Sequence, residues 1–322
     1  MRRRQFIGLI GGAAAWSRSA RAQQPAGRVW RIGFLGSTPP TPAMVSALRD
    51  GMRESGFVEG QNLSIDVRWL LDENPNVATE LVRSGVDLIV TWATPATIAT
   101  KRATTTIPIV MVSNADPVGA GLVAELARPG GNITGTSNMA TDLSAKVAQL
   151  LIEVAPGIKR VGVVRNSANP GTALSARETI ESIRALGLQI EPVDAETAEE
   201  LAIAFARMSA KGVGGVVVIA EPAYIKHRVR IAELAQKARL PTVFQRRENV
   251  EAGGLLSYGP DLNDLTHQSA LIAGRILRGA RPAELPVEQP TKFTLAINLK
   301  TAKAIGLIIP PMLIARADGV IE

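Results

Sequence analysis

Residues 31–36, Arg-Ile-Gly-Phe-Leu-Gly, form a short apolar run that ends in the turn-forming sequence Ser37-Thr38-Pro39-Pro40. This pattern predicts a buried strand followed by a turn. Residues 42–55 then predict an amphipathic helix that ends at Gly56, and residues 63–69 predict a second strand. Strands and helices continue to alternate beyond this point. Such alternation is typical of a parallel sheet covered by helices on both faces.

The same order of elements returns in the second half of the chain. Residues 160–165 repeat the first strand, 172–186 the helix and Gly187 its end, at an offset of about 130 residues. Leu240-Pro241 likewise stands where Ile107-Pro108 stood. We therefore predict an α/β protein made of two doubly wound parallel-sheet lobes joined by a hinge.

The repeat also sets the expected domain boundaries. Residues 28–140 are predicted to form the N-terminal α/β lobe and residues 141–265 the C-terminal α/β lobe, with hinge crossovers near 137–145 and 259–265. Residues 266–322 contain a Pro-rich stretch, a strand and a helix. This last segment is expected to return and brace the lobes and the hinge.

The first 22 residues have the features of an export signal. Arg3-Arg4 precedes an apolar stretch, and Ala20-Arg21-Ala22 offers the small residues that a signal peptidase reads. The paired arginines favour the twin-arginine export machinery, and an ordinary Sec signal is the alternative. No later stretch is long and charge-free enough to span a bilayer. We therefore expect a mature protein that begins near Gln23 and is soluble in the periplasm.

The net charge does not indicate a polyanionic partner. Of the 36 Lys and Arg residues, five lie within 1–22, and against 29 Asp and Glu the mature chain carries only +2. Arg246-Arg247 has the pattern of a short charged cluster on a solvated helix face. No dense basic run with interleaved aromatic residues is present, so we predict no nucleic-acid binding.

The chain offers little material for catalysis or for metal binding. It has no cysteine, which excludes a lipoprotein anchor, a disulfide framework and a thiolate zinc site. Its two histidines, His227 and His267, lie forty residues apart in stretches that predict amphipathic helices. Surface or satisfied helix histidines are the simpler interpretation. We predict no catalytic residue, no metal ligand and no cofactor.

Candidate ligand-binding residues follow the predicted strands of the first lobe, because the crevice of an open parallel sheet lies at the carboxyl ends of its strands. Ser37 and Thr38 follow the first strand. Thr94 and Asp116 each precede a proline, the pattern of a helix N-cap, so simple capping is the alternative to ligand binding. Neutral Thr94 would leave room for a ligand carboxylate, and Asp116 would suit an ammonium group. Trp92 could wall the cleft or fill a core.

The second lobe presents a matching set of polar residues. Ser167 and Asn169 follow its first strand, and Glu221 follows its third. Tyr258 ends its fifth strand and is the second large aromatic residue expected at the cleft. Together the two sets predict a cleft that could close on a small zwitterion.

Several sequence blocks resemble one protein family. They are Thr94-Pro95-Ala96, Asp116-Pro117-Val118-Gly119-Ala120-Gly121, Gly131-Asn132-Ile133-Thr134-Gly135, Gly253-Gly254-Leu255-Leu256-Ser257-Tyr258-Gly259 and Asn298-Leu299-Lys300-Thr301-Ala302. In this order, from about residue 29 to the end of the chain, they are similar to the substrate-binding proteins of ABC transporters that bind tryptophan or related amino acids. The resemblance implies a type I periplasmic-binding-protein fold and delivery of a ligand to a membrane permease. Amino-acid-binding members tend to carry an aspartate where this chain has Glu221, so the resemblance does not fix the ligand as an amino acid.

A regulatory sensing domain and an enzyme are the alternatives to a solute receptor. A ligand-sensing domain of a regulatory system shares the fold, but a transcription regulator needs a helix-turn-helix where this chain has its signal. An enzyme could use Asp116 and Glu221 as a carboxylate pair. However, the chain has no G-x-G-x-x-G, P-loop or G-x-S-x-G sequence beside its first strand or elsewhere. The favoured hypothesis is a receptor that closes two lobes over a small polar ligand, such as an amino acid or a small carboxylate.

Overall fold

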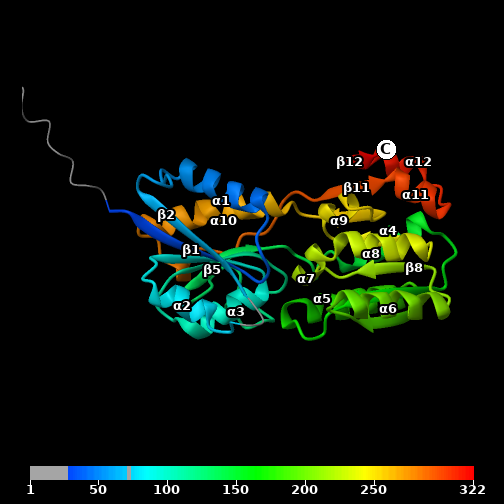
Figure 1. The fold of residues 1–322 in the computed structure, drawn as a ribbon, viewed down its shortest axis with the longest axis horizontal. Coiled ribbons are helices and arrows are strands. Elements are labelled where there is room, and N and C mark those ends of the chain that lie inside the picture. The colour runs from blue at the N-terminus through cyan, green and yellow to red at the C-terminus, as the bar shows by residue number, and fades with distance from the viewer. Residues whose placement is uncertain (1–27, 71–73) are drawn as a thin grey trace, which may run out of the picture.

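The computed structural model describes residues 28–70 and 74–322, so the export signal predicted at 1–22 lies outside the described residues. The chain forms two α/β lobes that lie side by side along the long axis of the molecule (Figure 1). Each lobe is built around its own sheet. The two-lobe, doubly wound architecture predicted from the repeat is thereby confirmed.

The first lobe contains a five-stranded sheet in the order β2-β1-β3-β4-β5, in which all neighbouring strands are parallel. From β1 the chain adds β2 on one side and β3 on the other, so the strand order reverses between β1 and β3. Ligands bind at this switch point in such sheets. The strands are β1 (Trp30–Gly36), β2 (Leu63–Trp69), β3 (Leu88–Trp92), β4 (Ile109–Asn114) and β5 (Ile133–Ser137).

Helices cover both faces of this sheet because alternate strand residues point to opposite faces. On β1, Phe34 packs in the cluster that includes α1 (Pro42–Glu54) and α10 (Leu262–Leu277), whereas Leu35 packs with α2 (Val77–Arg83) and α3 (Thr94–Ala103). Helices α1 and α10 approach closely at Gly51, where a Cβ would lie 2.7 Å from that of Ala270.

The second lobe contains a seven-stranded sheet in the order β12-β11-β10-β9-β8-β6-β7, in which only the β10–β11 pair is antiparallel. Its strands are β6 (Arg160–Arg165), β7 (Gln189–Asp194), β8 (Gly215–Val218), β9 (Thr242–Phe244), β10 (Leu256–Gly259), β11 (Thr294–Asn298) and β12 (Gly319–Ile321). Its helices are α4 (Ser144–Val154), α5 (Pro170–Ala185), α6 (Ala198–Ala210), α7 (Pro222–Lys226), α8 (Arg228–Lys237), α9 (Arg247–Glu251), α11 (Leu299–Ile305) and α12 (Pro311–Ala315).

The last part of the chain is divided between the lobes, which differs from the boundary expected at residue 265. Helix α10 belongs to the core of the first lobe, where Leu265 and Ile272 are buried beside α1 (Figure 1). Strands β11 and β12 instead extend the sheet of the second lobe. The apolar face of α10 determines this arrangement, because its buried side chains complete the layer that α1 leaves open.

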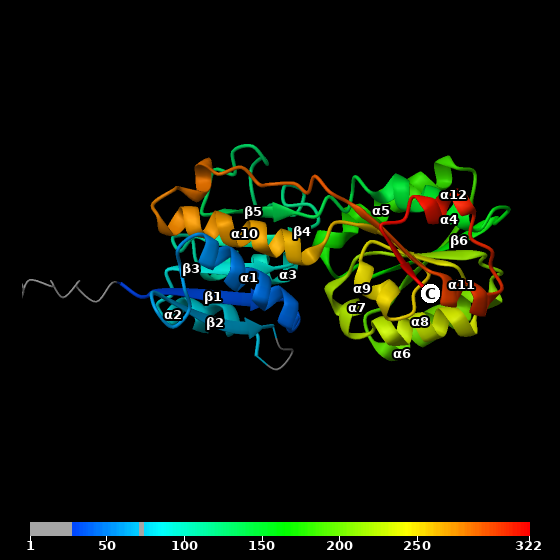
Figure 2. The same ribbon diagram turned by 90° about the horizontal axis from the view of Figure 1, so that it is seen from above.

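The chain consequently passes between the lobes three times. The first passage joins β5 to α4, the second joins β10 to α10, and the third runs from the 3-10 helix η1 (Pro282–Glu284) toward β11 (Figure 2). The third passage is held to β5, because Ser137 N donates to Glu288 O at 2.9 Å and Glu288 N donates to Gly135 O at 2.9 Å. Three adjacent passages restrict lobe motion to bending about one narrow region.

Candidate ligand-binding cleft

A groove of about 1060 Å³ lies between the lobes at the carboxyl ends of their strands. This is where open parallel sheets bind ligands. From the first lobe it is lined by Ser37, Thr38, Pro39, Trp69, Leu70, Pro95, Ile98, Ala99 and Arg102. From the second lobe it is lined by Asn166, Ala168, Asn169, Pro170, Glu196, Thr197, Ala198, Glu221, Pro222, Ala223, Lys226 and His227. Four of the residues predicted from sequence, Ser37, Thr38, Asn169 and Glu221, therefore face one groove.

The second-lobe wall is organised around Glu221, the N-cap of α7. Asn169 Nδ2 donates to Glu221 Oε2 at 2.9 Å, and Thr172 Oγ1 donates to the same oxygen at 3.4 Å. Asn169 is itself the N-cap of α5, since its Oδ1 accepts from Gly171 N at 3.0 Å. Asn169 and Glu221 thus each end a loop that follows a strand and leads into a helix. Their capping hydrogen bonds fix their side chains in place.

Glu221 is a buried carboxylate without a cationic partner. The residue is 5% exposed, and no Lys, Arg or His of the described chain lies within 4.0 Å of its carboxylate oxygens. Burial raises the pKa of Glu221, while hydrogen bonds from Asn169 and Ala223 act in the opposite direction. A carboxylate in this state interacts favourably with a cationic group that enters the cleft, because a buried charge is costly until it is paired.

The first-lobe wall carries one charged residue, the exposed Arg102, and the hydroxyl group of Ser37 is already hydrogen-bonded within its own lobe. Ser37 Oγ donates to Trp92 O at 3.1 Å and accepts from Ala96 N at 3.0 Å, so Ser37 caps α3 from a neighbouring loop. The backbone N-cap of α3 is Ala93, which has φ of 67° and makes no side-chain capping bond. The N-cap predicted at Thr94 is therefore wrong by one residue, because Ser37 supplies the oxygen that caps the helix.

Thr94 lies instead where the lobes touch. It is 3% exposed, and a Cβ placed on Gly171 would lie 2.2 Å from Thr94 Oγ1. Gly171 is in the first turn of α5, so the starts of α3 and α5 face each other across the cleft. A larger residue at position 171 could not be accommodated in this arrangement of the lobes.

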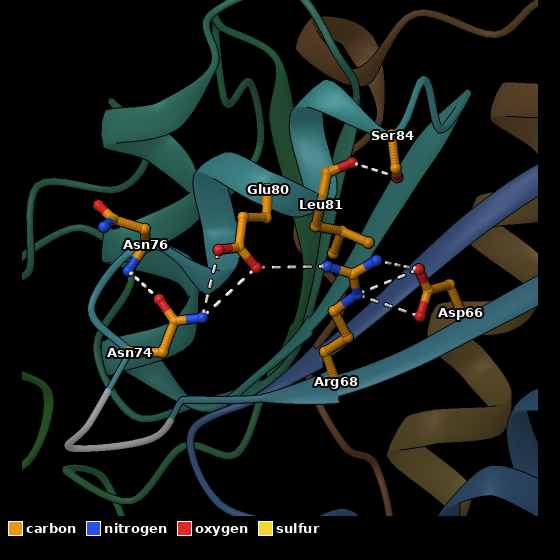
Figure 3. Close-up of polar contacts among 7 residues, drawn as sticks. All are labelled: Asp66, Arg68, Asn74, Asn76, Glu80, Leu81 and Ser84. Carbon is orange, nitrogen blue, oxygen red and sulfur yellow. Dashed lines mark hydrogen bonds and ion pairs between the residues drawn. The ribbon is translucent and has the colours of Figure 1, made fainter.

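A polar network joins β2 to α2 on the first lobe (Figure 3). Trp69 and Leu70, the next residues in the chain after Arg68, line the groove. On β2, Arg68 Nη2 pairs with Asp66 Oδ2 at 2.7 Å, and Arg68 Nη1 lies 3.8 Å from Glu80 Oε2 on α2. The hydrogen bond to Asp66 raises the pKa of Arg68. Because these groups are partly exposed, the network contributes little to stability.

Trp92 and Tyr258 do not wall the cleft. Trp92 is fully buried in the core cluster of the first lobe, which decides between the two interpretations of this residue in favour of packing. Tyr258 stacks on Phe293 with ring centroids 5.9 Å apart and packs at the edge of the second lobe's core. Both follow from strand alternation, because adjacent residues at a strand end face opposite sides of the sheet.

Asp116 and Ser167 lie outside the groove lining. Asp116 begins no helix; its Oδ1 accepts from Gly119 N at 2.8 Å and closes a turn. The prediction of a helix cap here is wrong because glycines at 119 and 121 follow, and Gly121 adopts φ of 66°. Ser167 is exposed, and its backbone N donates to Asp194 Oδ1 at 3.0 Å. Burial alone would raise the pKa of Asp194, but hydrogen bonds from Ser167 and Arg165 keep it below its usual value.

A second, inner cavity of about 10 Å³ lies beside the hinge. It is lined by Ser113, Asn138, Leu143, Ala220, Gln245, Arg246 and Pro260, which come from both lobes and from the passages between them. Ser113 has φ of 58°, an uncommon conformation for a residue with a side chain. Such conformations cost free energy and often occur at functional sites.

Arg246 was expected to be solvated, and that expectation is wrong: the residue is 8% exposed. The adjacent Arg247 is solvated as expected: it is exposed and pairs with Glu251 Oε1 at 2.9 Å. Their position in the sequence could have indicated a place near the cleft, because Gln245 and Arg246 directly follow β9 at the carboxyl edge of the sheet. A pair of adjacent arginines does not reveal which one turns inward.

Two general features bear on the class of protein. Over residues 28–70 and 74–322, no helix combines the length and the apolar character that crossing a membrane requires. Within the same residues, no cluster of three His, Asp or Glu side chains is arranged to hold a metal ion. His227 lines the groove, where burial lowers its pKa, and His267 Nε2 lies 3.1 Å from Glu54 Oε2 away from the groove.

Comparisons with known proteins agree with this geometry. The chain is 25% identical over 260 residues to a tyrosine-binding protein of Clostridioides difficile, covering 80% of this chain and 74% of that protein. It is 27% identical to a Streptococcus pneumonia ABC domain solved in complex with L-Trp, with a TM-score of 0.84 over 91% of this chain and all of the other. A conserved domain protein of Vibrio cholerae gives 27% identity and a TM-score of 0.85 over the same shares.

These solved structures confirm the type I periplasmic-binding-protein-like fold that the sequence resemblance implied. The sequence profile of the family described as ABC transporter substrate binding protein matches residues 35–321, which include both lobes and all three passages between them. The chain belongs to the ABC transporter substrate-binding protein family.

Proposed function

We propose that this protein is the extracytoplasmic receptor of an ABC importer, which closes its two lobes over a small polar ligand and delivers that ligand to a membrane permease. The observation that carries the proposal is the inter-lobe groove with Glu221, a buried carboxylate that has no cationic partner in the described chain. Such a wall suits a ligand with an ammonium group.

The ligand class we propose is an amino acid, with aromatic amino acids foremost. Relatives named for tyrosine and solved with L-Trp support this class. The groove of about 1060 Å³ is at the upper end of the size of small-molecule sites. In this function the protein performs no chemistry on its ligand, and no catalytic residue is assigned.

The proposed location is the periplasm, and it rests on residues 1–22. We propose that the signal is cleaved near Ala22 and that the protein then acts outside the cytoplasmic membrane. Cell fractionation of the full chain and of the Arg3→Lys, Arg4→Lys variant tests this. A parent protein retained in the cytosol would contradict the location, and equal export of the variant would contradict the twin-arginine route.

A thermal-shift screen tests the ligand. The twenty amino acids, small carboxylates and aromatic acids are each added to the purified protein. A ligand that binds only the folded state stabilises it by about 2.7 kcal/mol at one hundred times its dissociation constant. We expect L-tryptophan or L-tyrosine to raise the melting temperature. If no amino acid does so, the proposed ligand class is wrong.

A further inference from the structure

Arg246 is a buried cation that forms no ion pair within the described chain. It is the N-cap residue of α9 and is 8% exposed. No Asp or Glu of the described residues lies within 4.0 Å of its guanidinium nitrogens, and its Nε has no hydrogen-bond partner. Its neighbour Arg247 shows the ordinary arrangement, exposed and paired with Glu251.

An unpaired guanidinium is costly inside a protein. Buried charges are almost always paired or hydrogen-bonded, because removal from water is repaid only by a partner of opposite charge. Burial lowers the pKa of Arg246, and the negative charges of Glu248 and Glu221 act in the other direction. The guanidinium nevertheless stays protonated, since arginine does not lose its proton in proteins. The cost of burying this charge therefore persists until an anion arrives.

The surroundings of Arg246 point toward the space between the lobes. Arg246 and Gln245 both line the inner cavity, together with Ser113 of the first lobe. Gln245 Nε2 donates to Ala140 O at 3.0 Å, which fixes the side chain, and its Oε1 has no partner. A cationic donor and a neutral acceptor thus face one cavity at the hinge.

The small volume of the inner cavity determines in which arrangement of the lobes an anion could enter it. About 10 Å³ is the least space that holds a single water molecule. A carboxylate is larger, so it must arrive while the lobes are apart and be enclosed as they close. An anion that contacts Arg246 of the second lobe would then lie against Ser113 of the first.

We infer that Arg246 is the anion-binding residue of the inner cavity beside the hinge and that its guanidinium binds the carboxylate group of the ligand. The inference rests on the proposed receptor function and narrows it: the ligand carries a carboxylate, and a neutral amide of the same compound binds much more weakly. The planar guanidinium suits this task because it can donate two parallel hydrogen bonds to a carboxylate.

The test compares acids with their amides on three proteins. L-tryptophan, L-tyrosine and their carboxamides are titrated calorimetrically into the wild type, Arg246→Met and the matched control Arg247→Met. We expect the wild type to bind each acid at least about 30-fold more tightly than its amide, and Arg246→Met to lose about the same factor for the acid. Arg247→Met should stay within about twofold of the wild type. Equal binding of acid and amide by the wild type, or an Arg246→Met affinity within about threefold, would overturn the inference.

Melting temperatures separate binding from folding. Arg246→Met should melt no lower than the wild type without ligand, because it removes an unpaired buried charge. Arg246→Lys keeps the charge without the planar donor pair, and it should retain part of the preference for acids. If Arg246→Met does not fold, the wild-type comparison of acid and amide decides the question alone.

An acetate titration at constant ionic strength tests the anion site at Arg246 separately from the proposed amino-acid ligand. If neither amino acid binds the wild type, the amino-acid part of the proposed function fails, and acetate then decides the anion site. A rise in melting temperature shared by the wild type and Arg247→Met but absent from Arg246→Met supports the inference. The same response in all three proteins overturns it.

Discussion

The two walls of the cleft differ in charge. On the first lobe the charged residue that lines the groove, Arg102, is exposed, and Ser37 has both of its hydrogen bonds within its own lobe. On the second lobe the corresponding strand ends carry Glu221 and Arg246, which are the buried charged residues of the described chain. Neither has a partner of opposite charge within 4.0 Å.

This difference assigns separate tasks to the lobes. Charges recognise charged ligand groups most strongly where water is excluded, so the second lobe would select the ligand. The first lobe, which brings no buried charge to the groove, would then supply the surface whose closure excludes the water. Each prediction below tests one part of this division.

The largest effect is expected from removing the charge of the second-lobe wall. Glu221→Gln keeps the shape of the residue but leaves a ligand ammonium group without a counter-charge, so binding should weaken by about 2–5 kcal/mol. Calorimetric titration with the amino acid that binds the wild type measures the loss.

Asp116→Asn is the control on the first lobe, because Asp116 closes a turn and lines neither cavity. Its affinity should change by no more than about twofold, which is about 0.4 kcal/mol. If Asp116→Asn weakens binding as much as Glu221→Gln does, the charge difference between the walls does not govern recognition.

A smaller effect is expected from blocking the contact between the lobes. Gly171→Ala places a Cβ 2.2 Å from Thr94 Oγ1, so the closed arrangement should lose about 1–3 kcal/mol. Small-angle scattering should then show less contraction at a given ligand concentration. Gly131→Ala is the control, because a Cβ there meets nothing within 4 Å.

The double variant Gly171→Ala, Thr94→Gly removes the side chain that the new methyl group meets. It should recover the contraction that the single variant loses. A single variant that contracts like the wild type would show that the starts of α3 and α5 do not meet in the ligand-bound form.

The smallest effect is a pH dependence of folding stability. Burial holds the pKa of Glu221 above its ordinary value of 4.5, so the folded state binds this proton more tightly than the unfolded state does. The contribution of Glu221 to stability is therefore fully present below pH 4.5 and is lost as the pH rises through the folded pKa.

The comparison of Glu221→Gln with the wild type isolates this contribution. Because glutamine resembles the protonated acid, the stability of the variant relative to the wild type should increase between about pH 4 and pH 7. Thermal melts of both proteins across this range measure the difference. A constant difference would mean that burial does not perturb the carboxyl group.

The sequence was sufficient for the strand ends but not for the direction of side chains. Asn169 and Glu221 were predictable because each follows an apolar strand and precedes a proline, a pattern that brings a side chain to the cleft as a helix cap. Trp92 was also expected at the cleft because it ends its strand, but strand alternation turns it into the core. One residue of register decides between the two outcomes.

Long-range contacts account for the remaining differences. Ser37 caps α3 from 59 residues away, which no local pattern at Thr94 reveals. Helix α10 joins the first lobe only because α1 leaves an apolar surface uncovered, a fact that requires the packed structure. Arg246 and Arg247 are adjacent in sequence, and their opposite burial depends on how β9 meets the hinge.

Hydrogen exchange with and without the bound amino acid tests most directly whether the ligand is held between the two walls. The account predicts that amides of both walls slow together on binding, at residues 94–98 of the first lobe and at residues 169–172 and 221–224 of the second. Protection confined to one lobe, or protection at α11 and α12 on the far side of the second lobe, would contradict it.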